Sequence, residues 1–446
     1  MFNYRQALVE ALKYPGQVKY EIDSYDYYFQ EELNQTVVPN FHINKKIHGV
    51  YPVFGEKFRY FKQTSEALYR IFEKVAEERH KEINEGLDTF DFLEFEQRLI
   101  KHTPKSGKLI RHIRLDVIYS PSYKNLKVLE CNPENPGGIW DNDFAVNCMT
   151  RNRTRLYEGI FAANGDFGKI KHHKQKERLI NSLIHAYRDM FGEDPKTIAI
   201  GLFPEDDSAF IAHCEANYFR SLGFESLVVN PAEFRYENGK VYVGDKKIDV
   251  LFRGFLMEEI RQHIPRLEAM ASAYENDDIC IVPPFSDALI SSKTLMAEIP
   301  TRYSHLLTEE EKELIEDIFP EAVVVTPENY DEIMNNVMDK VVKAGEGYGG
   351  FGVIVGRQSY DKKLPDLEEI QKRPYISQKY YPHETIKCPY IDNGNVSIET
   401  VNVVLGNLVI LGEYTGTLVR GSLSDVINTH QGAEILTSID EDHILE

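Results

Sequence analysis

The chain has 446 residues, of which 42% are hydrophobic and 11% aromatic, enough to build the cores of two or three domains. Its formal net charge of −20 argues against a nucleic-acid partner or an anionic-membrane surface, because both attract basic proteins. The sequence shows no apolar leader and no run of 18 apolar residues, and its five cysteines form no C-x-x-C pair. We therefore expect a cytoplasmic protein with reduced thiols.

The first hundred residues are expected to form a helical N-terminal lobe, residues 1–105. Charged amphipathic periodicity predicts one helix from about 57 to 84 and another from 90 to 102. We expect this lobe to act as a cap or to face a substrate.

Two short strands follow in residues 111–133 and place polar chemistry on one face of a hairpin. Because side chains along a strand alternate, Arg114 and Asp116 share one face of the first strand. By the same rule, Glu130 and Asn132 project together from the second strand. The opposite face is expected to carry Ile113, Leu115, Val117, Leu129 and Cys131.

The polar face of this hairpin has the composition of a magnesium and phosphate site. Mg²⁺ takes hard oxygen ligands and is usually held by one or two carboxylates together with substrate phosphates. Asp116, Glu130 and Asn132 would supply such ligands. Arg114 would contact the phosphoryl oxygens. The alternative is an edge hairpin whose polar face is simply solvated. We assign the hairpin and the proline- and glycine-rich loop after it to residues 106–170.

Residues 171–285 alternate between helix and strand, which predicts a Rossmann-like α/β domain with a largely parallel sheet. The expected elements are a helix over 175–192, a strand over 197–203, a helix over 208–222, a strand over 226–230 and a hairpin over 234–250. No G-x-G-x-x-G follows the first strand, so no dinucleotide cofactor is expected. Arg253 ends a buried strand where α/β ligand sites lie, and it either binds a substrate carboxylate or serves as an ion-pair partner.

The last region, residues 286–446, mixes helices with strands. Its first helix is expected to carry Lys293, and Thr308 with Glu311 three residues later predicts the capped start of a second helix. The further expected elements are strands over 323–326 and 375–381, and a hairpin of 397–405 with 408–412 around the turn Gly406-Asn407.

A glycine-rich turn between two strand-like runs is the second strong motif, at residues 339–356. Walker and Rossmann loops lead into a helix, whereas this turn leads into a second strand. A flexible flap over nucleotide phosphates fits the pattern, with Lys343 on the entering strand reaching the phosphates. An unliganded glycine-rich turn is the alternative. The glycines of the motif are Gly345, Gly347, Gly349, Gly350 and Gly352.

Together, the two motifs and Lys293 resemble the ATP-grasp superfamily. In the usual chain order of that superfamily the nucleotide-binding lysines come first and the metal ligands last, whereas here the R-x-D and E-x-N strands come first. The chain therefore resembles the circularly permuted ATP-grasp ligases and is similar to the synthetase domain of glutathionylspermidine synthase. This resemblance implies an α/β (α+β) ATP-grasp fold in which residues 286–446 bind the nucleotide.

The resemblance implies ATP and two Mg²⁺ ions as cofactors and a role for each matching residue. The magnesium ligands match Asp116, Glu130 and Asn132. The arginine that stabilises the transferred phosphoryl group matches Arg114, and the two nucleotide-binding lysines match Lys293 and Lys343. The flap matches Gly347, Gly349, Gly350 and Gly352, and the adenine hinge matches Gln378, Lys379, Tyr380 and Tyr381. The hinge lacks the acidic residue that is common there, and Ala344 replaces the usual proline after the lysine.

The implied activity is amide-bond formation by a carboxylate–amine ligase. ATP would activate the carboxylate as an acyl phosphate, an amine would attack it, and ADP and phosphate would leave. The expected partners are small-molecule carboxylate and amine substrates, including an amino acid or a carrier-bound acyl group. The alternatives are a kinase acting on a hydroxyl of a small molecule, a carboxylate ligase that loads a carrier protein, and a nucleotide-binding regulator without turnover. The candidate substrate contacts are Arg253, Arg420 and Asn428.

Overall fold

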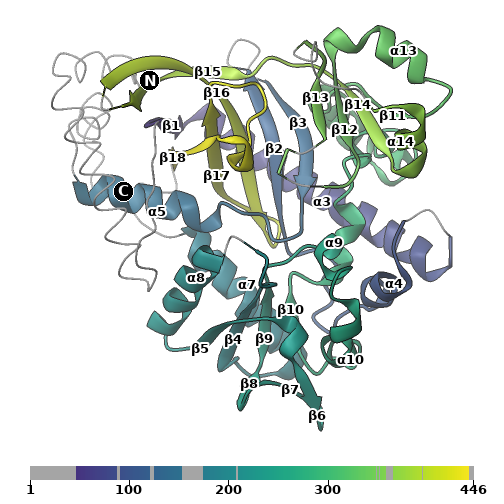
Figure 1. Ribbon diagram of the computed structural model, residues 1–446, viewed down its shortest axis with the longest axis vertical. Helices are drawn as coiled ribbons and strands as arrows, with labels where there is room; N and C mark the ends of the chain where they lie inside the picture. The colour runs from purple at the N-terminus through teal and green to yellow at the C-terminus, as the bar shows by residue number, and fades with distance from the viewer. Residues whose placement is uncertain are drawn as a thin grey trace.

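A computed structural model describes most of the chain and arranges it in several sheets with helices around them (Figure 1). The described residues are 47–87, 91–120, 125–152, 174–206, 209–347, 349–350, 352–357, 365–393 and 395–440. The first 46 residues of the expected helical lobe and the end of the 106–170 segment lie outside these ranges. None of the described helices combines the length and apolar character that crossing a membrane requires.

The largest sheet has seven strands and joins both ends of the described chain. Its order is β1-β18-β17-β16-β2-β3, and β15 pairs with β16 beside this path. The strands are β1 Val50–Val53, β2 His112–Ser120, β3 Asn125–Asn132, β15 Glu384–Asp392, β16 Asn395–Ile410, β17 Glu413–Ser422 and β18 Glu434–Asp440. The N-terminal region therefore contributes a strand as well as helices, because β1 pairs in parallel with β18.

One long helix covers one face of this sheet. The amphipathic pattern correctly predicted α3, Glu56–Asn84, while the second predicted helix is the shorter α4, Glu94–Lys101. Phe61, Leu68 and Phe72 of α3 are fully buried and belong to the same core as the inner residues of β2 and β16. Helices α5, Ile139–Asn152, and α7, Lys174–Phe191, pack against part of the sheet's other face (Figure 1). The rest of that face is left to the cavity described below.

The predicted polar hairpin is confirmed as β2 and β3, which pair antiparallel with Arg114 opposite Asn132 and Asp116 opposite Glu130. One side chain was placed on the wrong face. The register shifts between Asp116 and Val117, which leaves Leu129 as the extra residue of a β-bulge. Leu129 consequently packs with the cavity-side residue Ile118 and not with the α3 core.

The predicted turn at Gly406-Asn407 is wrong. β16 runs unbroken through both residues, and the chain reverses at Leu411 and Gly412, whose φ angles are 51° and 82°. Gly406 is needed for space: a Cβ there would lie 2.7 Å from Cδ of Arg114, whose side chain passes over it. Asn407 is fully buried and ties α3 to the sheet through its side chain.

The middle of the chain forms the parallel sheet that helix–strand alternation predicted. Its order is β10-β9-β4-β5, with every neighbouring pair parallel. The elements are β4 Thr197–Gly201, α8 Ala209–Ser221, β5 Glu225–Val229, β9 Val250–Arg253, α9 Met257–Ile260, α10 Glu268–Glu275 and β10 Cys280–Val282. The expected hairpin after β5 is instead a three-stranded meander of β6 Arg235–Glu237, β7 Lys240–Val243 and β8 Lys246–Ile248.

A four-stranded antiparallel sheet, in the order β11-β14-β12-β13, carries the glycine-rich motif. Its strands are β11 Ala322–Val325, β12 Lys340–Ala344, β13 Val353–Val355 and β14 Tyr375–Lys379, accompanied by α12 Glu309–Ile318, α13 Tyr330–Asn335 and α14 Leu367–Lys372. The capping prediction for α12 is confirmed, since Thr308 and Glu311 bond to each other's backbone amides. The helix predicted for Lys293 is wrong: this residue lies in the loop just before the short α11, Leu295–Glu298.

We expect Asn407→Ala to lower the free energy of unfolding by about 1–3 kcal/mol, because it removes a hydrogen-bond partner from each of two buried hydroxyl groups. In the wild type, the amide of Asn407 donates to Ser65 Oγ at 3.1 Å and accepts from Thr417 Oγ1 at 2.7 Å. Chemical denaturation would measure the loss. Asn395→Ala, at the exposed start of the same strand, is the matched control and should cost under about 0.5 kcal/mol. Equal losses in the two variants would contradict this account.

Candidate active site

A cavity of about 890 Å³ lies between the uncovered face of the large sheet, the four-stranded sheet and loops of the middle region. The large sheet contributes side chains from β2, β3, β16, β17 and β18, and the four-stranded sheet contributes side chains from all four of its strands. Its volume is typical of a small-molecule site. Nearly all residues that the sequence nominated line it, although they come from segments far apart in the chain.

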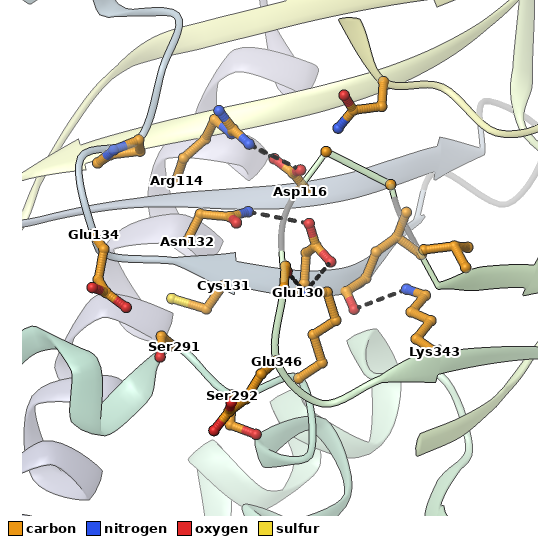
Figure 2. Close-up of a pocket in the computed structure, with 18 of the residues that line it drawn as sticks. Arg114, Asp116, Glu130, Cys131, Asn132, Glu134, Ser291, Ser292, Lys343 and Glu346 are labelled. Carbon is orange, nitrogen blue, oxygen red and sulfur yellow. Dashed lines mark hydrogen bonds and ion pairs between the residues drawn. The ribbon is translucent and has the colours of Figure 1, made fainter. Parts of the chain in front are cut away.

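The polar face of β2 meets a second arginine from β17. Arg114 donates through Nε to Oδ1 of Asp116 at 2.7 Å and through Nη2 to Oδ2 at 3.2 Å (Figure 2). Arg420 donates through Nη2 to the same Oδ2 at 2.6 Å. Burial alone would raise the pKa of Asp116, but the charges of Arg114 and Arg420 outweigh it and hold that pKa well below its usual value. Asp116 is therefore a carboxylate throughout the physiological pH range.

Glu130 and Asn132 project beside this pair from β3, as alternation predicted. Asn132 Nδ2 donates to Glu130 Oε1 at 3.4 Å. The ammonium of Lys293 lies 3.7 Å from Glu130 Oε2, and it also donates to the carbonyl of Gly347 at 2.6 Å. Lys293 thus touches both the carboxylate face and the glycine-rich turn.

The β-bulge at Leu129 connects the two sheets across the cavity. A bulged residue is left out of the regular hydrogen-bond ladder, and the Leu129 carbonyl accepts from Lys343 Nζ and from Gln378 Nε2, each at 3.3 Å. Burial lowers the pKa of Lys343 to about 8, although the charge of Glu130 partly opposes that shift. Lys343 is consequently a cation that loses its charge only a little above neutral pH.

The glycine-rich turn requires glycine at several positions. The φ angles of Gly347, Gly349, Gly350 and Gly352 lie between 71° and 103°, a region that other residues rarely adopt. The turn is tied to neighbouring segments by the Gly345 amide, which donates to the Pro374 carbonyl at 2.8 Å. At these glycines the backbone of the flap, defined as residues 345–352, can therefore approach a ligand with no Cβ in the way. Tyr348 and Phe351 of the flap lie outside the described residues.

The expected adenine hinge, residues 378–381, lines the cavity, but part of its backbone is already bonded. The amide of Lys379 donates to the Glu321 carbonyl and that of Tyr380 to the Asp339 carbonyl, each at 2.8 Å. Hinge contacts to adenine would therefore have to come from other groups of this segment, such as the Tyr381 amide or the side chain of Gln378.

Of the three residues predicted to contact substrate, two line the cavity and one does not. Arg420 and Asn428 line the cavity. Arg253 does not, because its guanidinium is fully buried in an ion pair with Asp287 at 2.6 Å and also contacts Glu134 at 3.3 Å. The ion-pair interpretation of Arg253 is the one that matches this geometry. Its effect on the cavity is indirect, since it helps to hold Glu134 in the cavity wall.

Several cavity residues escaped the sequence interpretation. Ser291 and Ser292 lie across the cavity from Glu130, and Glu346 joins them from the flap (Figure 2). Two sequence signals could have identified them. Ser291 and Ser292 directly precede Lys293, and Glu346 lies between two flap glycines. His383 also lines the cavity, but nothing in its sequence neighbourhood indicated this.

The oxygen donors on the polar face of the hairpin suit a metal ion that is also coordinated by phosphate. Across the described residues, no three His, Cys, Asp or Glu side chains gather closely enough to hold a metal ion. The carboxylates of Asp116 and Glu130, with the amide oxygen of Asn132, are hard donors of the kind that Mg²⁺ prefers. An ion bound there would need further oxygen ligands. Mg²⁺ held by one or two carboxylates usually completes its coordination with water and with phosphates of the substrate.

Comparison with curated proteins gives a distant relative without an assigned activity. No family model matches the chain. The uncharacterized protein ML0605 of Mycobacterium leprae is 22% identical in an alignment of 364 residues, and the match covers 76% of this chain and 60% of that protein. The chain therefore spans about 60% of the length of this relative.

Comparison with solved structures shows the fold. A glutathione synthetase-like effector, GSS30, from Globodera pallida is similar over 97% of this chain and 98% of its own, with a TM-score of 0.61 and 13% identity. A putative gamma-glutamylcysteine synthetase from Methylobacillus flagellatus matches 82% of this chain and 86% of its own at 10% identity, with a TM-score of 0.44, which is too low to establish a shared fold. ATP-grasp ligases are also among the structural neighbours. This chain thus shares a mixed α/β fold with a glutathione synthetase-like protein.

If Lys343 contacts nucleotide phosphate, as the resemblance implies, its lowered pKa predicts that the affinity for nucleotide depends on pH. Below pH 8 the lysine is charged, and above it the lysine must take up a proton to pair with phosphate. We expect the affinity for Mg²⁺ with the ATP analogue AMP-PNP to fall as pH rises above 8, by up to about tenfold per pH unit. Calorimetric titration between pH 7 and 9.5 would measure it. Lys343→Arg keeps its charge and should flatten the profile, and a slope equal to that of the wild type would contradict the assignment.

Proposed function

We propose that this protein is an ATP- and magnesium-dependent carboxylate–amine ligase of the circularly permuted ATP-grasp type. The observation that carries the proposal is the position of Lys293, whose ammonium contacts Glu130 of the carboxylate face and Gly347 of the flap. One cation thereby joins the two motifs that resemble the halves of an ATP site. The chain order, with β2 and β3 before the lysines, supports the permuted arrangement.

In this proposal, each side chain acts by position and charge. Asp116, Glu130 and Asn132 would hold Mg²⁺, which neutralises phosphate charge when bound. Lys293, from the loop before α11, and Lys343, from β12, would pair with the phosphates. The flap would exclude water that could hydrolyse an acyl phosphate. No nucleophile of the protein is required.

Arg114 is suited to stabilising the transferred phosphoryl group. Its Nη1 is anchored to the Gly137 carbonyl at 2.8 Å, while Nε and Nη2 contact Asp116. A guanidinium held at three points costs little reorganisation when negative charge develops beside it. The carboxylate, once phosphorylated, would be attacked by an amine, with release of ADP and phosphate. Roles for Arg420 and Asn428 in substrate binding, and two bound Mg²⁺ ions, belong to the same proposal.

Glu130→Gln should lower ADP formation by more than about a hundredfold, because it removes a charged oxygen from the proposed metal site. Release of ADP across a panel of amino acids and amines would measure it. Asp116→Asn should have the same effect but is less clean, since it also leaves two buried guanidinium groups without their carboxylate. Glu258→Gln, another cavity carboxylate, is the matched control. Full activity in Glu130→Gln would contradict the metal assignment.

Hydroxylamine distinguishes the ligase from a kinase with the same site. An acyl phosphate reacts with hydroxylamine to give a hydroxamate, whereas a phosphorylated alcohol does not. We expect hydroxamate to form in step with ADP. ADP release without hydroxamate, together with a phosphorylated hydroxyl product, would favour the kinase.

A further inference from the structure

The carboxylate of Asp116 is shared unequally by its two arginines. Arg114 reaches it from the same strand, has a further anchor at the Gly137 carbonyl, and has its stem fitted against Gly406. Arg420 reaches it from β17 through one nitrogen, Nη2, at 2.6 Å from Oδ2. Its Nε is buried and has no hydrogen-bond partner among the described residues. Moving the guanidinium of Arg420 away from Asp116 would therefore break fewer hydrogen bonds than moving that of Arg114.

The second proposed ligand carboxylate is also paired with a cation. Lys293 lies 3.7 Å from Glu130 Oε2, and its other contact is a flap carbonyl. Each carboxylate of the proposed metal site is thus compensated by a basic side chain that comes from outside the β2–β3 hairpin. A divalent cation could not bind either carboxylate without competing with these groups.

We propose that Arg420 is a placeholder for the metal: it neutralises Asp116 while the site is free of nucleotide, and it moves to a ligand oxyanion when metal and nucleotide bind. This inference rests on the metal assignment of the proposed function. In the exchange the metal takes over the oxygen that Arg420 leaves, and the guanidinium gains a new anion, so that neither Asp116 nor Arg420 is left without an opposite charge. Arg420 then presents Nε and Nη2, the two parallel donors of one guanidinium edge, to a phosphate or carboxylate.

The exchange predicts strong coupling between metal and nucleotide. Metal alone must break the pair between Arg420 and Asp116 and leave a nearly buried guanidinium, 4% exposed, without an anion. Metal together with nucleotide brings oxyanions to which Arg420 can turn. Removing the charge of Arg420 should therefore raise the affinity for metal alone. The factor by which nucleotide enhances metal binding should fall in the same proportion.

Mn²⁺ titration followed by electron paramagnetic resonance tests the exchange, because bound and free Mn²⁺ give distinct signals. The probe is Mn²⁺, first alone and then with AMP-PNP. Arg420→Met should raise the affinity for Mn²⁺ alone by about tenfold and reduce its enhancement by AMP-PNP in proportion. Arg302→Met removes the same charge from an arginine that pairs with Glu82 at 2.8 Å, and it should leave both values unchanged. Near-UV circular dichroism checks that each variant is folded.

If Arg420→Met does not fold, Arg420→Gln, which keeps a donor toward Asp116 without the charge, replaces it with the same expected shift. Unchanged or weaker binding of Mn²⁺ alone in the folded variant overturns the placeholder role, as does an equal shift in Arg302→Met. Absence of Mn²⁺ binding to the wild type even with AMP-PNP overturns the metal assignment itself. Binding to the wild type that is lost in Glu130→Gln, with no shift in Arg420→Met, overturns only the exchange.

Discussion

The ion pair between Asp116 and Arg420 ties together residues 304 positions apart in the chain and sets the geometry of the cavity. β16 lies between their strands, and Gly406 is the residue of β16 that pairs with Asp116. Since Gly406 has no side chain, Arg114 can lie over the middle strand and meet the same carboxylate. Removing one partner of such a buried pair costs about 3–5 kcal/mol, so in the proposed exchange Arg420 leaves Asp116 only when a metal replaces it there and an oxyanion receives the guanidinium.

Two features connect the two sheets around the cavity: the β-bulge at Leu129 and the long side chains that reach across from the other side. The bulge at Leu129 turns a carbonyl toward the four-stranded sheet, where Lys343 and Gln378 reach it. Lys293 completes the connection from a loop and not from a helix. Lys343 and Lys293 are long cationic side chains, which can exchange a protein partner for a phosphate without moving the backbone.

Sequence patterns succeeded where the interaction is local. Period-two alternation correctly grouped Arg114 with Asp116 and Glu130 with Asn132, because no register change separates the members of each pair. The same rule failed at Leu129, since a bulge depends on the partner strand and leaves no trace in its own periodicity. The prediction of a turn at Gly406-Asn407 failed because both residues serve contacts with distant parts of the chain. The glycine makes room for Arg114, and the asparagine bonds to α3.

The sequence by itself determined the chemistry of this protein: the carboxylate face of one hairpin, the lysine before a glycine-rich turn, and the helix–strand alternation between them. These follow from backbone periodicity and residue type, which act over a few residues. Only the tertiary structure decided that Arg420 shares Asp116, that Arg253 is enclosed in an ion pair, and that Ser291, Ser292 and Glu346 line the same cavity as the carboxylates. Such contacts depend on how distant strands are ordered in a sheet, and local sequence carries no record of that order.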